Sequence, residues 1–331
     1  MRRESTSGPL RLADLYAPIA EDLHRSQQIL TDELVSDEPL ISDLCHHVAQ
    51  FHGKRLRPAL LLLAAKACGD VRPAHHVLAA VVELVHIATL VHDDVLDEAD
   101  IRRRAATVNR LWGNERAVLM GDFLYSHAYH LCSQLDSPVP GRLVGQTAIT
   151  VCEGEMMQVA NRGNLELTES QYLDIITRKT AALVETCCHL GARYADADGE
   201  TVRRMREFGT CLGIAFQIVD DLLDVTGDEA EVGKSLGRDA SEGELTLPLI
   251  HYLRTAGPEQ RARLMPLLGP DREPGGRSLA AVLSGSASVA YARSVAAEHV
   301  ARARAALEGL PPSPARESLD AMAEFVIVRR Q

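Results

Sequence analysis

Several features that mark common classes of protein are missing from this chain of 331 residues. It has no excess of positive charge: the formal net charge is −11, which argues against nucleic acid or an anionic membrane surface as the main partner. The longest apolar runs, such as Ala59 to Ala65, fall far short of the roughly 20 residues that a membrane-spanning helix needs. No apolar segment of a secretory signal follows Met1. We therefore expect a soluble protein with no membrane span and no nucleic-acid partner.

The seven cysteines contain no C-x-x-C pair, and their number is odd. They stand mostly in apolar helical contexts, so we interpret them as small core residues in the reducing cytoplasm. Cys187-Cys188 and His46-His47 are better interpreted as packing or surface residues than as catalytic pairs. No convincing Ser/His/Asp or Cys/His arrangement is present, which favours a chemistry without a protein nucleophile.

Helical periodicity dominates the chain, and no convincing strand alternation interrupts it. The pattern predicts an all-α protein with one domain over residues 1–331, and the scattered glycines and prolines make 256–286 its longest irregular part. We expect helices near 12–32, 40–50, 56–68, 74–97, 115–135, 141–160, 169–195, 199–225, 244–255, 287–308 and 315–329.

An acidic motif ends the most apolar of these helices. The stretch from Val77 to Val91 is apolar on nearly every face, which is typical of a central, buried helix. Asp93, Asp94 and Asp97 follow it, and positions i and i+4 share one helix face. Close carboxylates repel each other unless a cation lies between them, and such oxygen-rich sites suit Mg²⁺ shared with substrate phosphates. One such motif alone would still favour a solvated acidic helix end.

The same spacing returns at Asp220, Asp221 and Asp224, again after an apolar helical segment. The two motifs are far enough apart in sequence to lie on opposing helices of a bundle. Facing carboxylates at one end of a bundle are a known way to build a metal site. Because two such motifs are improbable by chance, the repetition favours a magnesium site.

Three basic clusters accompany the acidic motifs. A diphosphate leaving group needs cations as well as metal ions, because its charge must be stabilised as its carbon–oxygen bond breaks. Basic clusters are usually solvated surface, but these stand beside the motifs. They are Lys54 with Arg57, the triplet Arg102-Arg103-Arg104, and Lys179-Thr180 together with Lys234.

At these residues the sequence resembles the trans-isoprenyl diphosphate synthases, or polyprenyl synthetases, of the long-chain type. The likeness spans about residues 50 to 250. It comprises Gly53-Lys54-Arg55-Leu56-Arg57-Pro58, His86, His92-Asp93-Asp94-x-x-Asp97, Arg102-Arg103, Gly121-Asp122, Gly154-Glu155-x-x-Gln158, Lys179-Thr180-Ala181, Phe216-Gln217-x-x-Asp220-Asp221-x-x-Asp224, Gly233-Lys234 and Thr246-Leu247-Pro248.

The resemblance implies a bundle of long helices around a deep central cavity, and a homodimer that in some members works with a small accessory subunit. It also implies that isopentenyl diphosphate and an allylic prenyl diphosphate are the substrates, and that about three Mg²⁺ ions bind per active site. The implied catalytic residues are Asp93, Asp94, Asp97, Lys179, Asp220 and Asp221. Among the aspartates, Asp93, Asp97 and Asp220 are the expected main Mg²⁺ ligands, supported by Asp94, Asp221 and Asp224. The implied isopentenyl diphosphate site is Lys54, Arg57, His86 and Arg103, and the implied allylic contacts are Arg102, Lys179, Thr180, Gln217 and Lys234.

Two positions depart from the family pattern. Members often have glycine where this chain has Arg104, and many have lysine where it has Glu244. Losing the second cation is expected to weaken diphosphate binding unless Arg104 or Lys234 compensates.

The resemblance also bears on product length. The growing chain is apolar and should run between helices beneath the aspartates, past Val85, Ala88 and Thr89, so small residues there predict a product of about six to eight isoprene units. Aromatic residues on the next helix, Phe123, Tyr125 and Tyr129, are candidates for a lower floor. The alternatives are a shorter-chain farnesyl or geranylgeranyl diphosphate synthase, a terpene cyclase and a non-catalytic partner subunit. The second aspartate motif argues against the last two.

Overall fold

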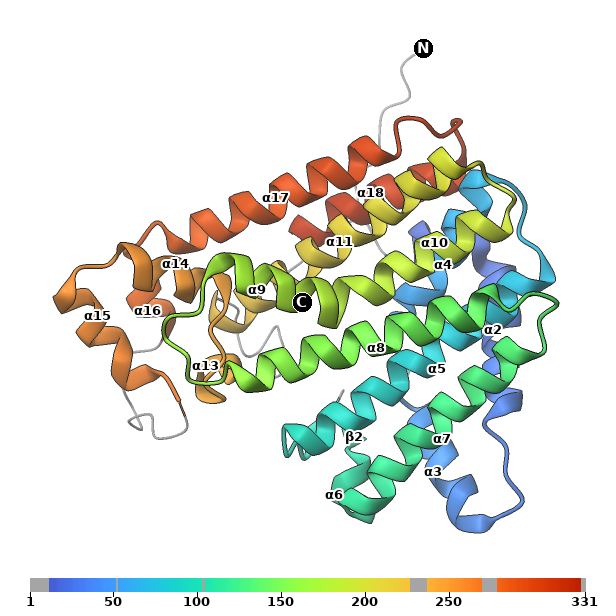
Figure 1. The fold of residues 1–331 in the computed structure, drawn as a ribbon, viewed down its shortest axis with the longest axis horizontal. Coiled ribbons are helices and arrows are strands. Elements are labelled where there is room, and N and C mark those ends of the chain that lie inside the picture. The colour runs from blue at the N-terminus through green and yellow to red at the C-terminus, as the bar shows by residue number, and fades with distance from the viewer. Residues whose placement is uncertain (1–11, 52, 103–104, 227–236, 270–278, 329–331) are drawn as a thin grey trace. The chain divides into compact units, whose positions relative to one another are not determined.

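The computed structural model describes residues 12–51, 53–102, 105–226, 237–269 and 279–328, and these are overwhelmingly helical (Figure 1). The prediction of an all-α protein is confirmed. The chain divides into two compact units. Unit 1 comprises residues 1–148, 186–205 and 309–319, and unit 2 comprises 149–185, 206–308 and 320–331. The expectation of one domain stays a prediction.

Unit 1 is built on α5 (Pro73–Leu96), which packs against α2, α4 and α7. Leu78, Val81 and Leu84 have no exposed surface, so the prediction of a central apolar helix is confirmed. By length and composition α5 could cross a membrane, but 72% of its most apolar window is buried inside the protein, as in the core helix of a soluble protein. The other elements up to α7 are α1 (Leu12–Leu15), η1 (Ala17–Ile19), α2 (Ala20–Glu33), α3 (Pro39–Ala49), α4 (Leu56–Cys68), β1 (Ile101–Arg102), β2 (Ala105–Ala106), α6 (Val108–Trp112) and α7 (Asn114–Ser133).

A two-stranded hairpin follows α5, which the sequence pattern did not predict. Strand β1 pairs antiparallel with β2, with Arg102 opposite Ala105. Two residues are too few for an alternation to register. The ring of His47 on α3 lies 2.7 Å (Nε2) from the carbonyl oxygen of Ala106 and contacts Trp112 edge to face. This agrees with the interpretation of His47 as a packing residue.

Four helices have residues in both units: α8 (Val139–Ala160), α10 (Ala182–Tyr194), α11 (Gly199–Thr226) and α18 (Pro314–Val328). The helix expected over 169–195 is interrupted by a π-helical segment, because η2 lies between α9 and α10. The expected irregular stretch 256–286 was partly wrong, since it contains α15, η3 and α16, which are too short for a clear period. The remaining elements are α9 (Glu169–Ile176), η2 (Thr177–Ala181), α13 (Arg238–Ser241), α14 (Leu247–Thr255), α15 (Pro258–Leu264), η3 (Met265–Leu267), α16 (Leu279–Leu283) and α17 (Ser288–Ala306).

Candidate active site

The first aspartate motif occupies the C-terminal end of α5 in unit 1. Asp93 and Asp94 lie in the last turn, and Asp97 is the C-cap, its backbone N–H donating to the carbonyl oxygen of Asp93 at 2.9 Å. Asp93 and Asp97 are partly exposed, whereas Asp94 is buried. Carboxylates at a helix C-terminus oppose the helix dipole, and the last turn of α5 contains no basic residue. A bound cation would offset both the unfavourable interaction with the helix dipole and the repulsion between the carboxylates.

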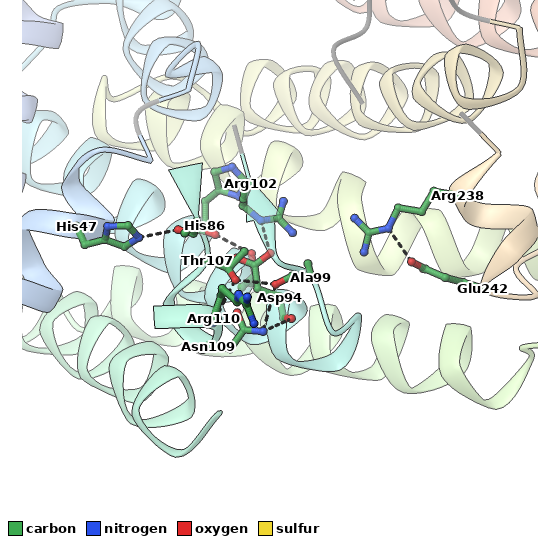
Figure 2. A network of polar contacts seen from close by, with 12 residues as sticks. His47, His86, Asp94, Ala99, Arg102, Thr107, Asn109, Arg110, Arg238 and Glu242 are labelled. Carbon is green, nitrogen blue, oxygen red and sulfur yellow. Dashed lines mark hydrogen bonds and ion pairs between the residues drawn. The ribbon is translucent and has the colours of Figure 1, made fainter. Parts of the chain in front are cut away.

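Asp94 is paired with Arg102, one of the predicted allylic contacts. The Nε of Arg102 donates to Oδ1 of Asp94 at 2.6 Å, and the Asp94 side chain is 1% exposed. The Asn109 side chain donates to the carbonyl oxygens of Asp94 (3.1 Å) and Ala99 (3.2 Å), and the Thr107 hydroxyl donates to Ala99 at 2.6 Å (Figure 2). These bonds fasten the hairpin to the end of α5, so Asp94 organises the loop that carries Arg102.

His92, just before the motif, is held by α7. Its Nε2 lies 3.0 Å from the carbonyl oxygen of Val118. A Cβ on Gly121 would lie 2.0 Å from that same nitrogen, so only glycine leaves room for the ring. The Gly121-Asp122 pair of the sequence motif therefore includes the close-contact point between α7 and α5.

The basic residues predicted to bind isopentenyl diphosphate surround the start of α4. Lys54 is exposed just before that helix, and Arg57 is partly exposed in its first turn. Arg55 between them has a left-handed backbone (φ 49°), a strained conformation often kept at functional sites. Tyr16 donates its hydroxyl to the carbonyl oxygen of Lys54 at 2.7 Å, which holds this turn in place. Arg103 lies outside the described residues.

Glu83 is a residue that the sequence analysis missed. It lies inside the apolar part of α5 and is only 5% exposed. Burial is the main cause that raises the pKa of Tyr16 and the pKa of Cys187. The negative charge of Glu83 raises both pKa values further, whereas the positive charge of Arg57 lowers that of Cys187. The sequence signal that could have identified Glu83 is the presence of a glutamate in an otherwise apolar part of the helix.

His86 and the predicted product-length residues follow on the same helix. His86 is partly exposed, Val85 and Ala88 are buried, and Thr89 is partly exposed with its hydroxyl donating to the carbonyl oxygen of His86 at 2.8 Å. Val85 and Thr89, four residues apart, share one face of α5.

The second aspartate motif lies near the end of α11 in unit 2 and, like the first, combines partly exposed with buried aspartates. Asp220 is partly exposed, whereas Asp221 and Asp224 are 5% and 3% exposed. The carboxylate of Asp224 accepts from the backbone N–H groups of Arg238 and Asp239, at 3.3 Å each, at the start of α13. Asp224 therefore ties α13 to α11.

Asp221 is the centre of a chain of hydrogen bonds. Its Oδ2 accepts from the Tyr172 hydroxyl at 2.6 Å, its Oδ1 accepts from Nε2 of Gln217 at 2.7 Å, and Oε1 of Gln217 accepts from the Thr180 hydroxyl at 2.8 Å. Burial raises the pKa of Asp221 to about 7, against the two donated hydrogen bonds that lower it. The structure thus brings the predicted residues Thr180, Gln217 and Asp221 together and adds Tyr172, which the sequence analysis missed.

Lys179 lies on η2 beside two carboxylates. Its Nζ is 2.7 Å from Oε2 of Glu155. Glu244, the residue that departs from the family pattern, accepts from Arg162 Nε at 3.1 Å and from the Gln158 side chain. Burial raises the pKa of Glu244, while the charges of Lys179 and Arg162 lower it. Arg162 thus forms an ion pair with the carboxylate of Glu244. Lys234 and Arg104, the expected compensating cations, lie outside the described residues.

The donor chemistry of the two motifs fits Mg²⁺. Each motif presents partly exposed carboxylates, Asp93 and Asp97 in one and Asp220 in the other, and carboxylate oxygen is the ligand type that Mg²⁺ prefers. Over the described part of the chain, no three His, Cys, Asp or Glu side chains gather closely enough to hold a metal ion by themselves. Mg²⁺ commonly uses one or two carboxylates and completes its shell with water and substrate phosphates.

Comparison with known proteins agrees with these features. Residues 38–283 match the family model of the polyprenyl synthetases. The chain is 35% identical over 314 residues to the octaprenyl diphosphate synthase of Escherichia coli (94% of this chain, 96% of that protein). It is 33% identical over 321 residues to heptaprenyl diphosphate synthase component 2 of Geobacillus stearothermophilus (96% and 98%). Its fold matches the crystal structure of a Caulobacter crescentus polyprenyl synthase complexed with calcium and isoprenyl diphosphate, with a TM-score of 0.92 and 32% identity over 98% of this chain and 100% of that one. The chain belongs to the polyprenyl synthetase family.

Proposed function

We propose that this chain condenses isopentenyl diphosphate units onto an allylic prenyl diphosphate to make a long polyprenyl diphosphate. The observation that carries the proposal is the repeated aspartate motif, which in each unit ends a long helix and combines partly exposed carboxylates with buried, hydrogen-bonded ones. Relatives named for octaprenyl and heptaprenyl products support the long-chain type over a farnesyl or geranylgeranyl diphosphate synthase.

Asp93, Asp97 and Asp220 would hold Mg²⁺ against the diphosphate of the allylic substrate. Their carboxylates are the partly exposed ones, and the relative crystallised with calcium and isoprenyl diphosphate supports a divalent cation at this site. Bound Mg²⁺ supplies Lewis-acid stabilisation of the charge that develops on the leaving diphosphate. We expect about three ions when the substrate is bound.

The protein's own side chains bind and orient the two substrates. Lys179 would neutralise the allylic diphosphate, and Thr180 and Gln217 would align the substrate. Lys54, Arg57 and His86 hold isopentenyl diphosphate with its double bond toward the allylic carbon, which makes the reaction effectively unimolecular. The carbon–oxygen bond of the allylic substrate breaks, its carbon bonds to the double bond, and a proton then leaves, with the departing pyrophosphate as a suitable base.

A second copy of the chain is the proposed partner. Along α8 in unit 2, Ile149, Met156 and Val159 are 54%, 64% and 42% exposed, and Cys152 on the same face is also exposed. This apolar stripe suits a homodimer in the cytoplasm. A small accessory subunit is the alternative partner, and the name of the component 2 relative supports a synthase of more than one component. Met156→Glu should shift the dimer toward monomer in analytical ultracentrifugation.

The function is tested by incubating the purified chain with Mg²⁺, farnesyl diphosphate and isopentenyl diphosphate and measuring product masses. We expect a ladder that ends at a long polyprenyl diphosphate. The double variant Asp93→Asn, Asp220→Asn should lower condensation by more than about 1,000-fold if both carboxylates bind the metal. Asp32→Asn, on the exposed surface of α2, is the control.

Other outcomes would identify the alternatives. Cyclic hydrocarbon from a prenyl diphosphate alone would indicate a terpene cyclase. Condensation that appears only after a partner protein is added would indicate a subunit of a heteromeric synthase. Undiminished condensation by the double aspartate variant would contradict the metal assignment.

A further inference from the structure

Tyr172 on α9 commits its hydroxyl to the second aspartate motif. The residue is 4% exposed, and its hydroxyl donates to Oδ2 of Asp221 at 2.6 Å, a distance typical of a strong bond between a hydroxyl and a carboxylate. The two residues are 49 positions apart in sequence. Tyr172 therefore fixes the carboxylate of Asp221 from a different helix.

The second oxygen of Asp221 fixes the amide of Gln217. Because Nε2 of Gln217 donates to Oδ1 of Asp221 at 2.7 Å, its Oε1 must face the other way, where it accepts from the Thr180 hydroxyl at 2.8 Å. Turning this amide over would place its oxygen against the carboxylate of Asp221, where two acceptors would face each other, whereas the Thr180 hydroxyl can accept as well as donate. One orientation of Gln217 is thus strongly favoured.

The backbone keeps the two ends of this chain close together. A Cβ on Gly213 would lie 2.6 Å from Cα of Ala181, so α11 approaches η2 more closely than any side chain at Gly213 would allow. The close approach sets the distance between Thr180 and Gln217, and the hydrogen bonds set their orientation. Both residues are partly exposed, whereas Tyr172 and Asp221 are buried behind them.

We propose that Tyr172 and Asp221 are positioning residues that align Gln217 and Thr180 with the allylic substrate, and that Asp221 is not a Mg²⁺ ligand. This rests on the proposed function, since it assigns the alignment to the condensation step. Both oxygens of Asp221 already accept from protein donors, in a side chain that is nearly inaccessible. Asp220, which is partly exposed, remains the ligand from this pair.

The test compares kcat and the Mg²⁺ concentration for half-maximal rate in four variants. Tyr172→Phe and Asp221→Asn should each lower kcat by about 10- to 100-fold, as loss of an orienting partner typically does, and leave the Mg²⁺ midpoint within about twofold of the wild type. The double variant should lose little more than Asp221→Asn alone, because Tyr172 acts on Gln217 only through Asp221. Asp220→Asn should instead raise the Mg²⁺ midpoint.

Tyr291→Phe is the matched control. Tyr291 donates to Glu169 on the same helix α9 at 2.9 Å, so this variant also removes one tyrosine–carboxylate bond, outside the network. It should keep the wild-type kcat. Thermal unfolding of each variant separates loss of alignment from loss of the fold.

Two results would overturn the inference alone. In the first, the wild type is active and the kcat of Tyr172→Phe lies within about twofold of the wild-type kcat. In the second, Asp221→Asn raises the Mg²⁺ midpoint as much as Asp220→Asn does. A wild-type chain that condenses nothing, with or without a partner protein, would overturn the proposed function together with this inference. If Tyr172→Phe does not fold, the comparison of Asp221→Asn with Asp220→Asn still decides the metal assignment.

Discussion

Arg102, in the hairpin that follows α5, donates to Asp94 at the end of that helix at 2.6 Å, and the carboxylate is almost wholly buried. Replacing one member of a buried ion pair leaves the other charge without compensation, which costs about 3 to 5 kcal/mol. Arg102→Met should therefore lower the free energy of unfolding by about 3 kcal/mol, the lower end because the Arg102 side chain is 22% exposed. Urea unfolding measures this.

The double variant Asp94→Asn, Arg102→Met removes both charges and should regain much of that stability. Arg110→Met breaks an ion pair with Asp100 whose members are 66% and 71% exposed, and should change the stability little. Equal losses in Arg102→Met and Arg110→Met would show that the Asp94 pair is not specially important for stability.

Gly121→Ala should disturb the end of α5. The new Cβ would lie 2.0 Å from Nε2 of His92, so α7 or the ring must move next to Asp93. We expect a loss of about 1 to 3 kcal/mol of stability, as for overpacking, together with reduced condensation. Gly145→Ala on α8 is the control, because nothing lies within 4 Å of the place that its new methyl group would take, and alanine favours a helix. Wild-type activity in Gly121→Ala would show that the contact does not position the motif.

The sequence allowed the helices and the two aspartate motifs to be predicted because both depend on local spacing. The largely apolar stretch from Val77 to Val91 predicted α5 as a buried helix, and i, i+4 spacing put Asp93 and Asp97 on one side of it. The division of the six aspartates into partly exposed and buried ones agrees with the distinction between main and supporting ligands. Which role each aspartate has in metal binding stays a prediction.

What could not be predicted depends on partners distant in sequence or on very short elements. Nothing local pairs Tyr172 with Asp221, since a tyrosine in an amphipathic helix looks like any core aromatic. The hairpin that carries Arg102 has two residues a strand, which is too short for a pattern. The π-helical turn at Lys179 leaves no signal in the apolar period of the surrounding helix.

Ala88→Phe should shorten the product while turnover continues. Ala88 lies five residues before Asp93 on α5 and is fully buried. If the growing product passes this part of α5, as we propose, a phenyl ring there should stop elongation early. Mass analysis of the products measures the effect. Because overpacking a buried site can cost about 1 to 3 kcal/mol, Thr89→Phe at the partly exposed neighbouring position serves as a second variant. Unchanged product length in both variants would place this part of α5 outside the path of the growing product.

Unit 1 should become less stable in mild acid because His75 is buried as a neutral ring. Its Nδ1 accepts from the backbone N–H of Arg72 at 2.8 Å and its Nε2 faces the carbonyl oxygen of Gly191 at 3.1 Å, so the ring is neutral. Burial is the main cause that lowers its pKa below 6.5 in the folded state. As the pH falls through that value, the unfolded chain takes up the proton first, so the free energy of unfolding decreases. His75→Gln, although less stable at pH 7.5, should show a shallower decrease between about pH 7 and 5 than the wild type, as measured by urea unfolding. Equal slopes in the wild type and His75→Gln would mean that His75 does not set the acid sensitivity.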